Sequence, residues 1–218
     1  TRSYSICANA NSGKLRIGVK RLAGGVFSQF ATTRLAAGDT LEVMPPIGDF
    51  TVRPDATAAR HRCAIAAGSG ITPVLSLVST TLESEPGSRW TVIFGNRRAG
   101  SVMFLDELEG LKDRYGPRLH LLHVLSREES VPLLTGRIDR QRLEGLFSAL
   151  VDFRSVDEWY LCGPSEMVAT ARDFIESRGV APALVRDELF FAAAPTTLLA
   201  ESETTGSVEL TFTLDGRE

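Results

Sequence analysis

Gly68-Ser69-Gly70-Ile71-Thr72-Pro73 decides the fold of this chain, because it joins two stretches of opposite pattern. The run before it, residues 63–67, is short and apolar, which is typical of a buried strand. After it, Val74, Leu75 and Leu82 fall on one helical face, and Thr72-Pro73 is typical of an N-cap followed by the first helical position. A strand, a turn of small residues and a helix in this order predict one unit of an α/β sheet.

The same turn suits the phosphates of a dinucleotide. Gly68 and Gly70 let a pyrophosphate approach the backbone, and the N-terminus of the following helix offers N–H groups and the positive end of its dipole. The pattern is half of a dinucleotide fingerprint, because Pro73 stands where the third glycine would be. The alternative is a tight turn between strand and helix that binds nothing.

Beyond the turn, strands and helices alternate. Short apolar runs predict the strands, and apolar side chains three or four residues apart predict the helices. Strands are expected at 90–94, 119–125, 159–162 and 185–191, and helices at 101–115, at 140–150 and between Pro164 and Gly179. This alternation predicts an α/β nucleotide-binding domain with a parallel, doubly wound sheet at 61–191.

The first 53 residues predict β structure instead. Leu15, Ile17 and Val19 alternate with polar or small residues, which is the period of a half-buried strand. Short strands are expected at 4–7, 15–19, 41–43 and 50–52. About four short strands are too few to close a barrel. We therefore expect a partial antiparallel β-barrel at 1–53, followed by a polar linker at 54–60.

The last 27 residues, 192–218, predict a second linker and the start of another domain. Residues 192–206 are rich in Ala, Thr, Ser and Glu, as linkers are. Residues 208–214 then alternate cleanly, and Asp215-Gly216 is typical of a hairpin turn. No second arm follows in the sequence. We expect 207–218 to be the first strand of a truncated domain, and the chain to be cut at both ends.

Composition narrows the class of protein. With 218 residues, 43% hydrophobic and 23% charged, the chain suits one or two ordinary globular domains. A net charge of −3 gives no support for nucleic-acid binding. The most apolar stretch, 63–78, is interrupted by glycines and Pro73, which argues against a membrane span. Three widely spaced cysteines predict neither a disulfide framework nor a metal site, and favour the reducing cytoplasm.

Basic and hydroxyl side chains follow two of the predicted strands. Gly95-Asn96-Arg97-Arg98 ends one strand and Ser126-Arg127 ends the next. No acidic residue is present where an NAD site would bond the ribose 2′-hydroxyl. Guanidinium forks and a hydroxyl suit a 2′-phosphate instead. A solvated surface position is the commoner explanation for any one arginine, but three at adjacent strand ends predict a phosphate site.

Three other groups permit either a cofactor role or a structural one. Cys162 ends the fourth predicted strand before Gly163-Pro164, and it either faces a cofactor or is simply buried. Arg2, Tyr4 and Ser5 offer a phosphate ligand, a flat ring and a hydroxyl, or they form an ordinary surface strand. The stretch 24–28 is either an anion cradle or merely a loop.

Together these stretches resemble the ferredoxin–NADP(+) reductase superfamily, whose members pass a hydride from a nicotinamide to a flavin. The likeness spans the chain and is nearest to the reductase components of bacterial oxygenases, especially the oxygenase that epoxidises the ring of phenylacetyl-CoA. It rests on the flavin motif R-x-Y-S at Arg2-Ser3-Tyr4-Ser5, on 68–73 and on Cys162-Gly163-Pro164. The resemblance implies an FAD-binding barrel at 1–53, an NADP-binding domain at 61–191 and a ferredoxin-like [2Fe–2S] domain from 207.

The resemblance also implies roles for residues of the FAD site. Arg2 would hold the FAD pyrophosphate, Tyr4 would stack on the isoalloxazine, and Ser5 would bond near flavin N5. Glu188 and Phe190 match residues that family members keep near the flavin. The second FAD phosphate loop is matched by Gly24, Gly25, Val26 and Ser28.

For NADP(H), the resemblance places Cys162 beside nicotinamide C4, with Thr72 as a phosphate ligand. The candidate NADP-binding residues are Gly68, Gly70, Thr72, Arg97, Ser126, Arg127, Cys162, Gly163, Pro164 and Met167. The candidate catalytic residues are Tyr4, Ser5, Cys162 and Glu188.

The sequence thus predicts an NADPH-dependent flavoprotein reductase that passes electrons through FAD to an iron–sulfur centre and an oxygenase, in phenylacetate catabolism. A plant-type cluster needs four cysteines in a C-x₄-C-x₂-C…C arrangement, and this sequence has none of them. The cluster would therefore bind elsewhere in the full-length protein. The alternatives are a nucleotide-binding fragment without catalysis, and a reductase that serves a different acceptor.

Overall fold

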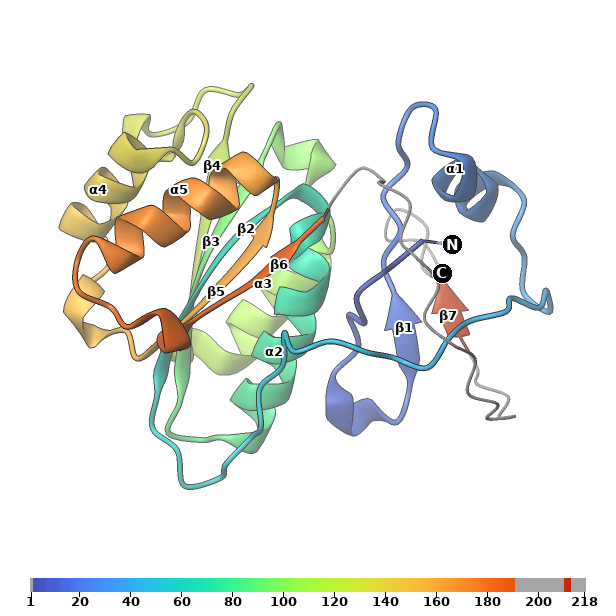
Figure 1. Ribbon diagram of the computed structural model, residues 1–218, viewed down its shortest axis with the longest axis horizontal. Coiled ribbons are helices and arrows are strands. Elements are labelled where there is room, and N and C mark those ends of the chain that lie inside the picture. The colour runs from blue at the N-terminus through green and yellow to red at the C-terminus, as the bar shows by residue number, and fades with distance from the viewer. Residues whose placement is uncertain (1, 191–209, 213–218) are drawn as a thin grey trace.

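A computed structural model describes residues 2–190 and 210–212 (Figure 1). Its centre is a sheet of five parallel strands in the order β4-β3-β2-β5-β6. The strands are β2 (His61–Ala67), β3 (Arg89–Asn96), β4 (Leu119–Leu125), β5 (Glu158–Gly163) and β6 (Val185–Leu189). The predicted parallel α/β sheet is confirmed, and β4 has the bounds that its apolar run predicts.

Helices cover both faces of this sheet (Figure 1). The helices α2 (Ile71–Ser84) and α3 (Leu105–Tyr115) pack on one face, and α4 (Arg140–Ala149) and α5 (Ser165–Glu176) pack on the other. Each pair closes its own apolar cluster against alternate residues of the strands, since Phe94 belongs to the α2 cluster and its neighbour Ile93 to the α5 cluster.

The strand order reverses at β2. From β2 the chain moves outward through β3 to β4, then returns to pair β5 with the opposite side of β2. In open α/β sheets, ligands bind at the carboxyl ends of the strands beside such a reversal. The carboxyl ends of β2 and β5 are therefore where a nucleotide site is expected.

Two helix starts differ from the sequence prediction. Thr72 is not the N-cap of α2, because Gly68–Gly70 forms a 3-10 turn (η2) that runs directly into the helix and makes Gly70 the N-cap. The helix predicted from residue 101 begins only at Leu105, because Phe104 adopts a left-handed conformation with φ 58°. The residues before it form a separate 3-10 turn, η3 (Ala99–Ser101).

The N-terminal region contains less regular structure than predicted. It holds η1 (Ala10–Ser12), β1 (Leu15–Ile17) and α1 (Val26–Thr33). The antiparallel part is a bridge between Ile6 and Ile17, extended by a 2.8 Å hydrogen bond from the Cys7 amide to the Arg16 carbonyl. On its other side β1 pairs in parallel with β7 (Leu210–Phe212).

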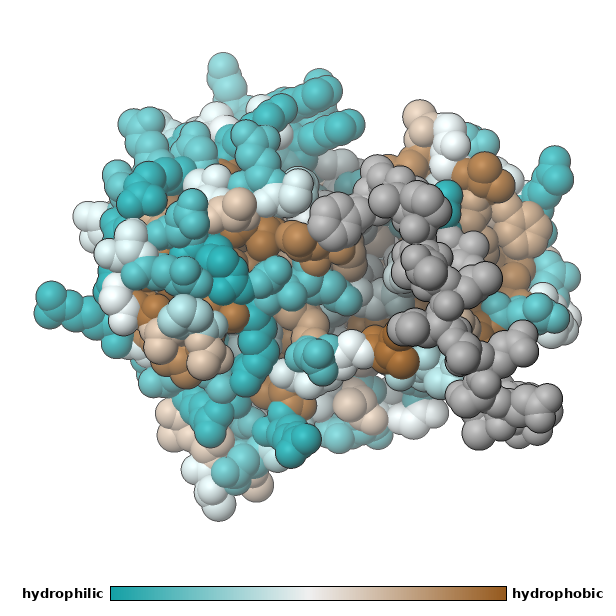
Figure 2. All heavy atoms as spheres, in the orientation of Figure 1, coloured by the Kyte–Doolittle hydropathy of each residue, from teal (hydrophilic) through white to brown (hydrophobic). Residues whose placement is uncertain are grey.

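The strands predicted at 41–43 and 50–52 do not form. Pro45 and Pro46 have no backbone N–H to give to a ladder, and the Thr51 amide bonds locally to the Asp49 carbonyl. The predicted loop at 24–28 is partly helix, since α1 starts at Val26. Over the N-terminal surface, apolar side chains gather above α1 (brown in Figure 2), and Leu22, Val26 and Phe30 are exposed there.

Several predictions concern segments outside the described residues: the linker 192–206, residue 191 of the last sheet strand, and the hairpin turn at Asp215-Gly216. Among the residues that the structure does describe, no helix is long and apolar enough to cross a membrane. In that same part of the chain, no cluster of three or more potential metal-ligating side chains occurs.

Candidate functional site

The turn after β2 is held against the end of β5. A Cβ on Gly70 would lie 2.2 Å from the carbonyl oxygen of Cys162, so only glycine fits there. Inside the turn, the Thr72 hydroxyl donates a 2.9 Å hydrogen bond to the Ser69 carbonyl. The close approach holds the turn against the carboxyl end of β5, next to the N-terminus of α2.

Cys162 and Gly163 lie at the carboxyl end of β5, against this turn. Cys162 is completely buried, and burial raises the pKa of its thiol, with a further increase from the charges of Glu188 and Asp187. The thiol is therefore protonated at neutral pH and is a poor nucleophile. Gly163 has φ 153°, a backbone conformation that favours glycine.

The predicted arginines are brought together at the neighbouring strand ends. Backbone pairing continues past β3 and β4, with a 2.9 Å bond from the Ser126 amide to the Asn96 carbonyl and a 2.8 Å bond from the Arg127 amide to the Arg97 carbonyl. Arg97 and Arg127 therefore lie side by side, and both are exposed. The nearby Glu128 carboxylate accepts from the Ala99 amide at 2.8 Å, which fixes the loop after β3.

Asn96 supplies an orphaned polar group at the same edge. Its side chain is buried, and within the described part of the chain neither Oδ1 nor Nδ2 has a hydrogen-bond partner. Buried amides are normally paired, so a bound molecule or ordered water is expected to complete this one. The sequence identified Asn96 only as part of a strand end.

Lys20 is a functional candidate that sequence reasoning missed. Its Nζ lies 3.5 Å from the Ser101 carbonyl oxygen, and it would lie 3.8 Å from a Cβ built on Gly68. Burial lowers the pKa of Lys20, and the charge of Arg97 lowers it further. A cation is thus placed above the turn from the N-terminal region. The sequence assigned Lys20 to the solvent side of a strand, and no local signal showed that it reaches the turn.

A hydrogen bond joins two predicted catalytic residues that lie 183 positions apart. The Ser5 hydroxyl donates to Glu188 Oε2 at 2.8 Å, and both residues are half-buried. Glu188 stands opposite Cys162 in the β5–β6 register. The structure therefore brings Ser5, Glu188 and Cys162 to one end of the sheet.

The remaining flavin candidates gather around α1. The rings of Tyr4 and Phe27 are 5.3 Å apart, and burial raises the pKa of Tyr4 although the charge of Arg2 opposes the shift. The Ser28 hydroxyl is used internally, since it accepts from the Leu22 amide at 3.2 Å and donates to the Gly25 carbonyl at 3.3 Å. An anion at this stretch would therefore meet backbone groups and not a free hydroxyl. The stretch comprises Gly24, Gly25, Val26 and Ser28.

These groups fit a dinucleotide at the carboxyl edge. Its phosphates would meet the glycine turn, the N-terminus of α2 and Lys20, and exposed arginines lie at the neighbouring strand ends. Pro164 is the N-cap of α5 and is exposed beside Gly163. Such an arrangement can bind the phosphates of a dinucleotide.

Comparison with known proteins finds two matching domain families. Residues 64–173 match the oxidoreductase NAD-binding domain, and residues 1–52 match the oxidoreductase FAD-binding domain. The chain is 39% identical to a subunit of the 1,2-phenylacetyl-CoA epoxidase of Escherichia coli K12 over 218 residues, which is 100% of the chain and 61% of that protein.

Two further proteins are similar to most of the chain. The ferredoxin reductase component of the Rhodococcus rhodochrous 3-ketosteroid-9-alpha-monooxygenase is 30% identical over 87% of the chain and 50% of its own length. The crystal structure of an Amycolatopsis cytochrome P450 reductase superposes with a TM-score of 0.73 at 26% identity, over 87% of the chain and 56% of that structure. The chain spans about half to three fifths of the length of the curated relatives it matches.

Proposed function

The chain belongs to the ferredoxin reductase family of FAD- and NAD-binding oxidoreductases, and from that premise we propose that its parent protein is an NADPH-dependent flavoprotein reductase. It passes electrons from NADPH through FAD to an iron–sulfur centre and then to an oxygenase. The observation that carries the proposal is the Ser5–Glu188 hydrogen bond, because it ties the flavin motif to the carboxyl edge of the nucleotide sheet.

When bound, NADPH and FAD supply the hydride and electron chemistry, and the protein supplies binding and orientation. Gly68, Gly70 and Lys20 would hold the pyrophosphate of NADPH. Arg2 and the backbone at the start of α1 would hold the phosphates of FAD, and the Tyr4 ring would pack against the flavin. Ser5 holds a hydroxyl, oriented by Glu188, at the carboxyl edge of the sheet.

The preference for NADPH is attributed to the loops after β3 and β4. Arg97 and Arg127 are exposed neighbours with guanidinium donors, and Ser126 adds a hydroxyl. These donors suit a 2′-phosphate. Glu128, an acid on these loops, accepts a hydrogen bond from the Ala99 amide.

Cys162 is proposed to act by position and not as a nucleophile. Its thiol is buried and its pKa is raised, so it presents a small neutral group where the nicotinamide would lie.

The terminal acceptor follows from the relatives. The epoxidase subunit and the monooxygenase component named above both belong to oxygenase systems, so the proposed acceptor is an oxygenase, and phenylacetate catabolism is the proposed context. The cluster is assigned to another part of the parent protein, because Cys7, Cys63 and Cys162 are separate buried thiols. Free thiols favour the cytoplasm as the compartment.

The test is anaerobic reduction of added FAD by NADPH in the presence of the 218-residue chain. We expect the visible flavin absorbance to fall, and to fall more slowly in a Cys162→Ser variant. Cys63→Ser is the matched control, because Cys63 is also fully buried but lies inside β2. Binding of both cofactors without any bleaching would support the non-catalytic alternative. Equal slowing by both variants would reduce Cys162 to a packing residue.

A further inference from the structure

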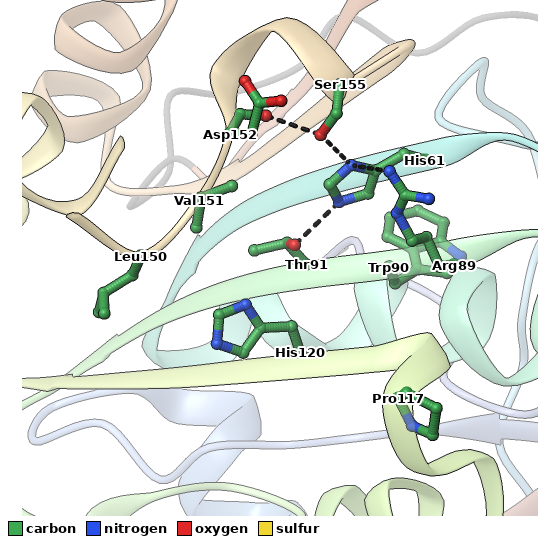
Figure 3. Close-up of a pocket in the computed structure, with 10 residues that line it drawn as sticks. All are labelled: His61, Arg89, Trp90, Thr91, Pro117, His120, Leu150, Val151, Asp152 and Ser155. Carbon is green, nitrogen blue, oxygen red and sulfur yellow. Dashed lines mark hydrogen bonds between the residues drawn. The ribbon is translucent and has the colours of Figure 1, made fainter. Parts of the chain in front are cut away.

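A polar cavity lies at the edge of the sheet opposite the glycine turn, where the strands begin (Figure 3). Its volume is about 250 Å³. The polar side chains that line it are His61, Arg89, Thr91, His120, Asp152 and Ser155. Because β2 runs from His61 to Ala67, this cavity is roughly 20 Å from the glycine turn at about 3.3 Å per residue. A ligand here would not overlap the nucleotide.

His61 is fully bonded within the cavity wall. Its Nδ1 lies 2.9 Å from the Ser155 hydroxyl and its Nε2 lies 2.9 Å from the Thr91 hydroxyl. The Ser155 hydroxyl donates to the Asp152 carbonyl oxygen at 2.7 Å, so Ser155 Oγ accepts from His61 Nδ1–H. The Asp152 contact is through backbone, and a hydrolytic Ser-His-Asp arrangement is therefore not formed.

Arg89 and His120 keep donors for a ligand. The Arg89 guanidinium is 3.4 Å from His61 Nδ1, which already donates to Ser155, so this approach is no hydrogen bond. Across residues 2–190, no salt bridge involves Arg89 and no hydrogen bond involves the His120 ring. His120 stands opposite Thr91 in the strand register, and both open toward the same cavity (Figure 3).

Arg89 is the cation that lines the cavity, and the two nearby carboxylates are engaged by backbone amides. The carboxylates of Asp152 and Asp157 are engaged by the Arg154 and His61 backbone amides, at 3.0 Å and 2.7 Å. Burial lowers the pKa of His61, with Arg89 as the next cause, and burial with the Lys112 charge lowers the pKa of His120. The imidazoles are thus neutral at pH 7, and an added anion would favour their protonated forms.

We propose that this cavity binds a small oxyanion, a carboxylate or a phosphoryl group, between the Arg89 guanidinium and the His120 ring. Binding is linked to proton uptake by His61 and His120, so it strengthens as the pH falls below neutrality. The cavity is slightly smaller than ordinary small-molecule pockets of about 300–1,000 Å³, which suits a compact anion.

The test is NMR titration of the three histidines of the whole chain between pH 5 and 8. Sulfate is the probe, because its charge is constant over that range, and sodium chloride at equal ionic strength is the salt control. Sulfate should raise the titration midpoints of His61 and His120 by at least about 0.3 pH unit, with saturation. His123 is the internal control, since it contacts Phe94 on the other face of the sheet and should not respond.

The variant Arg89→Gln should abolish the sulfate response, and His120→Gln should weaken the response of His61. Arg34→Gln, an exposed arginine after α1, should leave it intact. Repeating the titration with acetate and with phosphate then separates a carboxylate site from a phosphoryl site. An equal response to sulfate and chloride, or a full response in Arg89→Gln, would overturn the proposal.

Discussion

The α/β region (61–190) and the N-terminal region (2–53) differ in how they are held together. The α/β region closes two apolar clusters of its own, one on each face of the sheet. In the N-terminal region only Cys7 and Ala8 belong to the buried apolar core, and Cys7 joins the α2 cluster. The N-terminal region therefore depends on its partner for a core.

The regions meet through apolar packing, as of Phe50 on Tyr160, and through polar contacts. The Ser76 hydroxyl donates to the Ala8 carbonyl at 2.6 Å, and the Thr80 hydroxyl accepts from the Ala10 amide at 2.9 Å. The α/β region is thus rigid by its own packing, and the N-terminal region contributes individual side chains to it. The α/β region fixes the glycine turn by close packing, and the N-terminal region delivers single side chains, Lys20 and Ser5, to its edge.

The largest expected difference is in amide exchange. Amides of β2, β3 and β5 lie in the buried core and should exchange only through global unfolding. Between 36 and 53, few amides have backbone acceptors, as for Asp39 and Thr51. Protection measured by mass spectrometry should be at least about a thousandfold higher in the three strands. Similar protection of the three strands and of residues 36–53 would contradict the proposed difference in packing between the two regions.

The next largest expected effect is the loss of stability when a buried arginine is removed. Arg62 has a side-chain exposure of 1% and pairs with Glu85 at 2.6 Å and Glu158 at 2.6 Å. Arg62→Ala leaves two carboxylates buried without it, so the free energy of unfolding should fall by about 3–5 kcal/mol. Arg140→Ala is the matched control, because its pair with Glu144 is half exposed, and it should lose less than about 1 kcal/mol. Urea unfolding measures both, and equal losses would contradict the account.

Alanine substitutions of two glycines should change the free energy of unfolding by smaller amounts and in opposite directions. Gly70→Ala drives a methyl group into the Cys162 carbonyl and should lower the free energy of unfolding by about 1–3 kcal/mol. Gly110→Ala, inside α3 with nothing within 4 Å, should raise it by about 0.5–1 kcal/mol. Thermal unfolding of the two variants is the measurement. An unchanged free energy of unfolding in Gly70→Ala would show that Gly70 does not lie against the Cys162 carbonyl.

The smallest effect is a dependence of stability on pH. The pKa values of His61, His120 and His123 are all lowered, with burial as the first cause. The unfolded chain therefore takes up protons before the folded one does. The stabilisation is complete above about pH 6.5 and is lost as the pH falls through the folded values. The urea midpoint should drop between pH 8 and pH 5.5, and less so in His61→Gln. A midpoint that rises on acidification would contradict the lowered values.

Periodic apolar patterns predicted most of the α/β region. The run at 119–125 is β4, and the pattern at 140–150 is α4 within one residue, because burial of one face dictates both. The start of α3 was missed, because the left-handed Phe104 breaks the helix without a glycine or proline to signal it. The N-terminal strands were overpredicted, since alternation alone does not supply a neighbouring strand.

The candidate site was predictable where backbone geometry demands a residue type. Gly70 has no room for a Cβ and Gly163 has a φ that favours glycine, and both constraints are visible as glycine in the sequence. Lys20 and Asn96 could not be predicted, because their roles depend on where a distant turn or an empty hydrogen-bonding position lies. The site assignments that rest on family resemblance alone, such as Arg2 and Gly24, stay predictions.

The central claim is that the carboxyl edge of the α/β region binds a nicotinamide nucleotide and that the arginines after β3 and β4 select the 2′-phosphate. Calorimetric titration of the chain with NADP⁺ and with NAD⁺ tests it most directly, with Arg127→Ala as the variant. A charge-assisted hydrogen bond contributes about 1.5–3 kcal/mol, so NADP⁺ should bind about 10- to 150-fold more tightly than NAD⁺. Arg127→Ala should remove most of that preference and leave NAD⁺ affinity nearly unchanged. Equal affinities for the two nucleotides, or equal losses of both in the variant, would contradict the account.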